Sequence, residues 1–283
     1  MKNTQYKLDK ELLSQLYKII APSEQEFAMQ NFLMNFLIDV EDVDFMIDQS
    51  GNILVTKGES ETYPCLCAHM DEVFDSREVL GRVPVEEDGK WTGYSIANDS
   101  ECGLGADDKN GIYIALEALR ILPAVKVVFT VTEEQGGIGA SEVELSFFDD
   151  CRFVLEADRK GNSDLIIQAG GIDLCSDEFL KALREVRNKY HYRKQRGLLT
   201  DVMVLKDRGL DVSCLNISCG YYEPHTLREY TVSEDLEKAL NFVMEICETV
   251  TETYPHFYAM VDDKNDWYEK KEQENKLEWP WAW

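Results

Sequence analysis

Residues 125–134 read VKVVFTVTEE, a run of β-branched and aromatic side chains that ends in two glutamates. A strand that is apolar on both faces is typical of the centre of a parallel sheet, where helices cover each side. The segment before it, KNGIYIALEALRIL at 109–122, places its apolar residues at helical spacing. A helix that leads into such a strand is the repeating unit of α/β proteins, so this stretch predicts an α/β fold.

The alternation of strands and helices continues on both sides of this stretch. Upstream, VDFMI and ILVT flank a turn and predict a hairpin over 43–56. The other predicted elements are a strand at 64–68, strands RFVLEA at 152–157 and DLIIQ at 164–168, a helix at 176–190, strands DVMVL at 201–205 and VSCLNI at 212–217, and a last helix to about Val250. We therefore expect a mostly parallel central sheet with helices on both faces.

Two pairs of residues have the spacing of a helix capping box. Ser23 and Glu26 precede an apolar run through Leu37, and Thr231 and Glu234 precede the last predicted helix. We expect each pair to begin a helix by satisfying its first backbone amides.

Composition narrows the choice of partners and compartment. The chain has 283 residues with 29 Lys and Arg against 54 Asp and Glu, a net charge of −25. Such a charge repels nucleic-acid backbones and anionic lipid surfaces. No apolar run approaches the roughly 18 residues of a membrane helix, and the first residues are charged where a signal peptide would be apolar. We expect a cytoplasmic protein without nucleic-acid or membrane partners, and its oligomeric state stays open.

The chain contains eight cysteines, and none belongs to a C-x-x-C pair. In a cytoplasmic protein we expect them to be reduced, buried thiols. We expect one domain over 1–261, followed by a charged, tryptophan-rich tail at 262–283. The tail is either solvated or docks its tryptophans on a protein surface.

Acidic and imidazole side chains occur where the predicted strands end. They are His69 and Asp71 after the strand at 64–68, Asp107 at the start of a helix, Glu133 and Glu134 after the central strand, Asp158 after the strand at 152–157, and His225 after the strand at 212–217. The carboxyl ends of parallel strands share one edge of a sheet, so these groups converge there. Their mutual repulsion would be costly without cations among them.

The types of ligand narrow the choice of metal. Two imidazoles with several carboxylates suit zinc, and also manganese or cobalt, better than magnesium or calcium. The set is too large for one tetrahedral centre and fits two metal ions that share a bridging carboxylate. One glutamate of the pair at 133–134 is then free to take a proton from water.

Five motifs resemble those of the co-catalytic di-metal exopeptidases, most closely the peptidase T and glutamyl-aminopeptidase branches. They are AHMD at 68–71, GADDKNG at 105–111, TEEQGGIGA at 132–140, EAD at 156–158 and PHTLREY at 224–230. The motifs occur in the family's order. The resemblance implies a single hydrolase-like metallopeptidase catalytic domain that cleaves amide bonds with two divalent metal ions.

The resemblance also implies which residues bind each metal ion. His69 and Glu134 would bind one ion, Asp158 and His225 would bind the other, and Asp107 would bridge both.

Two further roles follow from the same resemblance. Glu133 would be the general base, and Asp71 would orient the imidazole of His69 from behind. The family pattern also implies a cis peptide bond between Asp107 and Asp108.

The sequence departs from relatives that carry a lid domain. Such a lid is inserted either between the first histidine and the bridging aspartate or between the last two ligands. Here 38 positions separate Asp107 from His69, and 67 separate His225 from Asp158. Neither interval has room for an additional domain of ~100 residues, so we expect a catalytic domain without a lid. The basic pair at 159–160 either binds a substrate carboxylate or offsets the carboxylate cluster.

We interpret the chain as a di-metal aminopeptidase that acts on short peptides. An acidic site attracts a free α-ammonium group, which favours removal of amino-terminal residues. Two other functions stay open: an N-acyl amino acid deacylase on the same site, and a non-catalytic peptide-binding domain on a metallopeptidase scaffold. Faster turnover of blocked substrates would select the first, and peptide binding without turnover would select the second.

Overall fold

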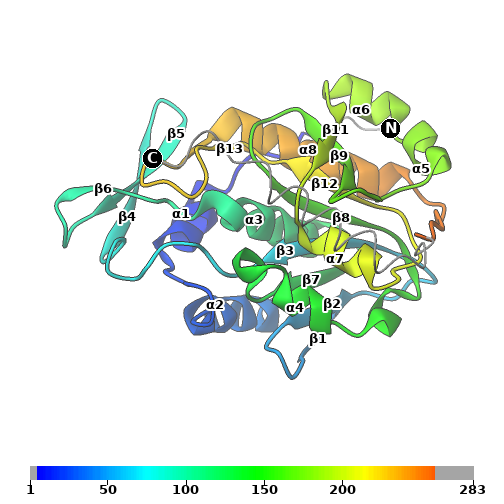
Figure 1. Ribbon diagram of the computed structural model, residues 1–283, viewed down its shortest axis with the longest axis horizontal. Helices are drawn as coiled ribbons and strands as arrows, with labels where there is room; N and C mark the ends of the chain where they lie inside the picture. The colour runs from blue at the N-terminus through cyan, green and yellow to red at the C-terminus, as the bar shows by residue number, and fades with distance from the viewer. Residues whose placement is uncertain (1–4, 259–283) are drawn as a thin grey trace, which may run out of the picture.

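Four parallel strands form the centre of the main sheet in the computed structural model, which describes residues 5–258. They lie in the order β7 (Val125–Thr130), β3 (Tyr63–His69), β8 (Cys151–Arg159) and β12 (Cys214–Ser218). Because all four run in the same direction, their carboxyl ends meet at one edge of the sheet (Figure 1). The parallel centre that the sequence predicts is confirmed.

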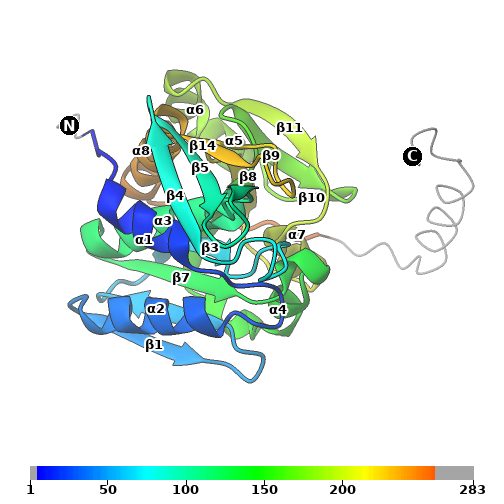
Figure 2. The same cartoon turned by 90° about the vertical axis from the view of Figure 1, so that its left-hand side faces the viewer.

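Antiparallel strands extend this sheet at both ends. At one end lie β1 (Val43–Ile47) and β2 (Ile53–Lys57), which form the predicted hairpin beside β7. At the other end, β9 (Asp164–Ala169) is antiparallel to β12, and β10 (Ile172–Asp173) and β11 (Arg193–Gly197) pair with β9. Figure 2 shows β1 and the helix α2 along the first of these ends.

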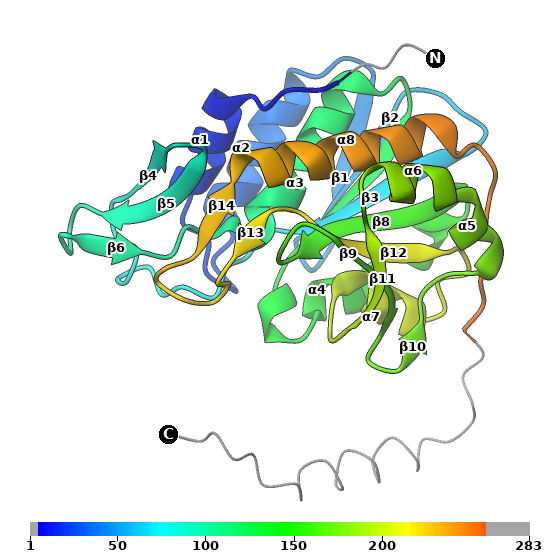
Figure 3. The ribbon, with the colours of Figure 1, turned by 90° about the horizontal axis from the view of Figure 1, so that it is seen from above.

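Helices cover both faces of the main sheet (Figure 3). One face carries α1 (Lys10–Lys18), α2 (Phe27–Ile38), α3 (Ala106–Ile121) and α8 (Ser233–Thr249), with α5 (Asp177–Ala182) and α6 (Arg184–Lys189) toward the β9 end. The other face carries α4 (Ile138–Glu142) and α7 (Asp201–Asp207). Along β7, Val127 and Phe129 enter the larger core while Val128 enters the smaller one. The strand is therefore apolar on both faces, as its sequence predicts.

A smaller sheet stands beside the main one. It contains β4 (Arg82–Glu87), β5 (Lys90–Ser95), β6 (Ser100–Cys102), β13 (Tyr221–Tyr222) and β14 (Tyr230–Val232), and projects near α1 in Figure 1. The pairing of β14 with β5 joins the segment that follows β3 to the segment that follows β12. Two turns of 3-10 helix, η1 (Glu133–Gln135) and η2 (Leu145–Phe148), complete the described elements.

One predicted strand is wrong, because residues 201–205 lie in the helix α7. β-branched residues favour strands, but the tertiary environment overrides this preference. The buried carboxylate of Glu156 on β8 accepts the backbone N–H groups of Asp201 (3.2 Å) and Val202 (3.3 Å). These amides belong to the first turn of a helix, so a residue 45 positions earlier in the chain stabilises its start.

Three local predictions also need correction. The helix predicted at 176–190 is divided at Leu183 into α5 and α6. Neither capping box forms: α2 and α8 begin without a side-chain cap. Instead, Ser23 donates its hydroxyl to Asp71 at 2.6 Å, and Glu26 accepts the backbone N–H of Thr132.

The cysteines agree with the sequence interpretation. All eight cysteines are buried and unpaired. Within residues 5–258, no helix has the length and apolar character needed to cross a membrane. The tail predicted at 262–283 lies outside the described residues.

We predict that Gly105→Ala destabilises the fold, because this glycine fills a tight left-handed turn. Its φ is +66°, and an added Cβ would overlap the Glu72 carboxylate and the Lys109 ammonium group. Left-handed backbone costs roughly 1–2 kcal/mol for a non-glycine residue, and overpacking adds about 1–3 kcal/mol. Urea unfolding of the metal-free protein measures the loss.

Gly81→Ala is the matched control, because Gly81 has a φ of +67° and an added Cβ would approach no atom closer than 3.8 Å. This variant should show the backbone cost alone. Equal losses for the two variants would contradict the close packing at Gly105.

Candidate metal centre

Asp107 lies between two imidazoles at the carboxyl edge of the sheet. Its Oδ1 is 3.1 Å from Nε2 of His69, and its Oδ2 is 3.3 Å from Nε2 of His225. The peptide bond from Asp107 to Asp108 is cis, as the resemblance implies. One carboxylate therefore presents an oxygen to each imidazole, which is the arrangement of a bridging ligand.

The other two predicted ligands are divided between the imidazoles. Oε1 of Glu134 is 3.2 Å from Nε2 of His225, and Oδ1 of Asp158 is 3.9 Å from Nε2 of His69. The contacts therefore group His69 with Asp158 and His225 with Glu134. These contacts differ from the pairing expected from the sequence, His69 with Glu134 and Asp158 with His225, which stays a prediction.

The order of the strands explains why the observed contacts differ from the expected pairing. Strands β3 and β8 are neighbours, so His69 at the end of one lies beside Asp158 near the end of the other. His225 belongs to the loop between β13 and β14, which the smaller sheet carries across to Glu134. Order along the chain does not reveal either neighbour.

The donor set fits divalent cations. Ligand atoms of His69, Asp107 and Glu134 lie within 4.8 Å of one another, and so do those of His69, Asp108 and Asp158. Oδ2 of Asp108 is buried and has no hydrogen-bond partner among the described residues. An unpaired buried carboxylate oxygen is rare because it is costly, and a cation would satisfy it.

Burial and charge act against each other in this cluster. Burial alone would raise the pKa of Asp107, but His225 and His69 lower it strongly. Burial raises the pKa of Asp158 well above its usual value, and Asp107 adds to that effect. Burial likewise raises the pKa of Glu133 to about 9. Without cations, some of these groups must hold protons, and cations would supply the same compensation of charge.

Asp71 contacts both His69 and the turn that carries the two glutamates. Nδ1 of His69 lies 3.0 Å from the main-chain oxygen of Asp71 and 3.4 Å from its Oδ1. A carbonyl oxygen only accepts, so Nδ1 carries the proton and Nε2 is the nitrogen that faces Asp107. The Asp71 carboxylate also accepts the backbone N–H of Glu133 (2.9 Å) and of Glu134 (3.3 Å). Asp71 therefore contacts His69, and it also holds the backbone of η1, which the sequence did not reveal.

A second buried layer lies beneath the predicted ligands. Glu156 accepts the hydroxyl of Thr200, and Asp201 accepts that of Thr130. Burial raises the pKa of Glu156 to about 8 and that of Asp201 to about 6. The sequence did not indicate either carboxylate as part of the site: Asp201 lies in the segment predicted as a strand, and Glu156 precedes the predicted ligand Asp158 by two positions. Glu156 and Asp158 are two positions apart on β8 and so share a face of the strand, and this spacing was the one available signal that Glu156 lies near the site.

The basic pair at 159–160 contributes little to the geometry of the site. Nε of Arg159 lies 3.5 Å from Oδ2 of Asp164, which is the first residue of β9. The ligand Asp158 is held instead by the buried Tyr221, whose hydroxyl donates to Oδ1 at 3.0 Å. Both interpretations of the basic pair therefore stay open.

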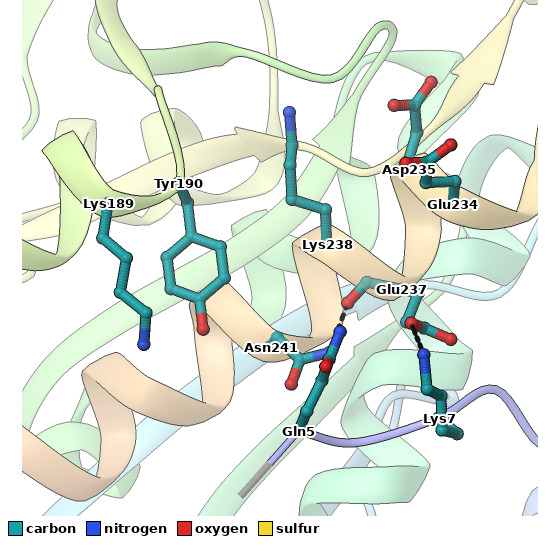
Figure 4. A pocket seen from close by; sticks show the side chains of 9 residues that line it. All are labelled: Gln5, Lys7, Lys189, Tyr190, Glu234, Asp235, Glu237, Lys238 and Asn241. Atoms are coloured by element: carbon teal, nitrogen blue, oxygen red, sulfur yellow. Dashed lines mark hydrogen bonds and ion pairs between the residues drawn. The ribbon is translucent and has the colours of Figure 1, made fainter. Parts of the chain in front are cut away.

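A polar cleft of about 750 Å³ lies elsewhere, along α8 and the amino-terminal segment (Figure 4). Acidic and basic side chains both line it, and Lys7 pairs with Glu237 across 2.7 Å. None of the predicted site residues lines this cleft. The convergent carboxylates, and not the size of a cavity, therefore identify the candidate site.

The fold described above is similar to that of several aminopeptidases of known structure. The aminopeptidase PepT from Bacillus cereus superposes with a TM-score of 0.69 at 16% identity, covering 87% of this chain and 99% of that one. A tripeptidase from Staphylococcus aureus gives 0.65 at 16% identity, covering 85% and 97%. A TET aminopeptidase from a marine sediment archaeon of the Thaumarchaeota gives 0.66 at 14% identity, covering 84% and 96%.

The sequence itself has no such match. No protein-family model matches it, and neither does any functionally curated protein. The similarity to the solved structures therefore establishes the α/β fold, and the function has to be argued from the site.

We predict that double variants distinguish the two possible pairings of ligands. If His225 and Glu134 hold the same ion, a variant with both changed to alanine should retain one metal ion per chain. A variant with His225 and Asp158 both changed to alanine should retain none, because each site has lost a ligand. Mass spectrometry of the dialysed proteins measures the metal content. The reverse result would restore the pairing stated from the sequence.

We predict that Asp71→Asn destabilises the protein even without metal. An amide oxygen replaces only one of the two carboxylate oxygens, so its NH₂ group faces a backbone N–H of η1. An unsatisfied buried donor costs about 1–3 kcal/mol of unfolding free energy. Denaturant unfolding in the presence of a chelator measures this loss.

Asp44→Asn on the exposed strand β1 is the control and should change stability by less than about 0.5 kcal/mol. Equal stability of Asp71→Asn and wild type would show that the carboxylate does not hold the glutamate turn.

Proposed function

We propose that this protein is a di-metal aminopeptidase that removes amino-terminal residues from short peptides. The observation that carries the proposal is Asp107, whose two oxygens each face a separate imidazole–carboxylate pair. The shared fold with PepT, a tripeptidase and a TET aminopeptidase supports the same reaction class.

The ligand assignment follows the contacts. His69 and Asp158 would hold one ion, His225 and Glu134 would hold the other, and Asp107 would serve both. Mixed imidazole and carboxylate ligands suit zinc, with manganese or cobalt as substitutes. When bound, the two ions supply Lewis acidity toward the scissile carbonyl and increase the acidity of water.

Glu133 is the general base in this proposal. It is 7% exposed, and its backbone N–H is fixed by Asp71, so the side chain starts from a rigid turn. It accepts a proton from the attacking water and delivers that proton to the leaving amine.

The charge of the site selects the substrate terminus. The ligands, Glu133 and the layer at Glu156 and Asp201 are mostly carboxylates, in a chain of net charge −25. A field of this sign attracts the α-ammonium group of a peptide and repels its carboxylate. Cleavage next to the amino terminus follows from this orientation.

We predict that Glu133→Gln keeps both ions and the fold but lowers kcat by about 10²–10⁴-fold, the usual contribution of a general base. The assay uses protein loaded with zinc, manganese or cobalt on dipeptides, tripeptides, aminoacyl anilides and N-acylated amino acids. Glu142→Gln, an exposed position on α4, is the matched control and should keep wild-type activity.

Three results would contradict the proposal. No amide cleavage by the loaded wild type would overturn the enzymatic function. Faster turnover of blocked substrates would favour a deacylase instead. Loss of metal from Glu133→Gln in parallel with activity would assign Glu133 as a ligand.

A further inference from the structure

A buried glutamate connects the loop of His225 to the turn of Asp107. Glu229 is 1% exposed, and its carboxylate accepts three successive backbone N–H groups. Oε2 accepts from Gly105 at 2.5 Å and from Ala106 at 3.1 Å, and Oε1 accepts from Asp107 at 3.2 Å. Among residues 5–258, no other carboxylate accepts a hydrogen bond from these three N–H groups.

The three amides lie just before the regular part of α3, because Asp107 and Asp108 have non-helical backbone angles, and such N–H groups have no partner within the helix. The residue at the cap position is Gly105, which has no side chain to satisfy them. A carboxylate is the strongest acceptor for such a group of donors, and it also interacts favourably with the helix dipole. Glu229, 122 positions further along the chain than Asp107, supplies this cap.

The loop that carries His225 is otherwise held by exposed contacts within itself, which include the ion pair of Arg228 with Glu223. The side chain of His225 is 53% exposed, and residues 225–228 are all exposed. Within the loop, the main-chain oxygen of Thr226 accepts the N–H of Glu229 at 3.1 Å. Glu229 therefore ends a short turn only four residues after His225, and its carboxylate fixes that turn to the backbone of Asp107.

We propose that Glu229 is a positioning residue for the ion held by His225 and Glu134. It sets the separation between the imidazole of His225 and Oδ2 of Asp107, which is 3.3 Å. The assignment of an ion to this pair rests on the proposed function, whereas the contact between Glu229 and the three amides belongs to the protein chain alone. His69 and Asp158 are on β3 and β8, so only Asp107 among the proposed ligands of the other ion contacts Glu229, and that ion depends less on the His225 loop.

The alternative is that Glu229 only stabilises the fold. If Glu229 only caps the helix, its substitution should lower the free energy of unfolding and leave the ratio of the two metal affinities unchanged. A positioning role instead weakens one ion selectively. The ratio of the two affinities therefore separates these roles.

The test compares Glu229→Gln with Glu223→Gln, the same substitution at an exposed position of the same loop. In the first variant an amide NH₂ group would face a backbone N–H at the start of α3. Co²⁺ titration into the metal-free proteins, followed by absorption, measures the affinity of each ion. Amide hydrogen exchange of the metal-free proteins measures the protection of residues 105–107.

We expect Glu229→Gln to bind one Co²⁺ ion as wild type does and the other ~10–100-fold more weakly, the usual size of such an indirect effect. Its amides at 105–107 should exchange faster than those of wild type, and Glu223→Gln should match wild type in both measurements. Where Glu229→Gln does not fold, Glu229→Asp keeps the charge, withdraws it by one methylene and should show the same selective loss.

The test distinguishes failure of the proposed function from failure of the positioning role of Glu229. Wild type that binds no Co²⁺ would overturn the proposed function, while faster exchange at 105–107 in the variant would still support the Glu229 contact. Wild type that binds two ions, together with variants that bind both at an unchanged affinity ratio, would overturn the positioning role.

Discussion

The structure depends on one electrostatic constraint, which is that a single carboxylate must face two imidazoles in a buried, acidic environment. Asp107 meets both partners at hydrogen-bond distance, and Asp158, Glu134, Glu133 and other carboxylates surround it. Like charges at this density repel one another unless cations or protons compensate them. The four parallel strands, the smaller sheet and the turn at η1 all serve to hold these groups together despite that repulsion.

The support extends well beyond the ligands. Glu72, which follows β3, accepts the guanidinium of Arg82 at 2.9 Å and the ammonium of Lys109. Arg82 in turn donates to the main-chain oxygens of Tyr17 and Gly103. These buried pairs join α1, the smaller sheet and α3 behind Asp107. Because the carboxylate of Glu72 is paired with two cationic side chains, the network fixes the loops without adding to the negative charge of the site.

Much of the fold and the residues of the candidate site could be predicted from local sequence. The doubly apolar strand at 125–130 and the hairpin at 43–57 follow from patterns of burial and turn residues, which act over a few positions. The helix α7 could not be predicted in this way, because its start is stabilised by Glu156 on a distant strand. The capping boxes failed for the same reason, since Ser23 finds a better partner in Asp71.

The sequence by itself determined which residues are candidates for the chemistry, because the types and order of the imidazoles and carboxylates at the strand ends can be read along the chain. Only the tertiary structure decided how they are paired. His69 lies with Asp158 because β3 and β8 are neighbours, and His225 lies with Glu134 because the smaller sheet carries its loop across the edge. Distances between ligands depend on strand order and on contacts such as that of Glu229, and neither is encoded at any fixed spacing in the chain.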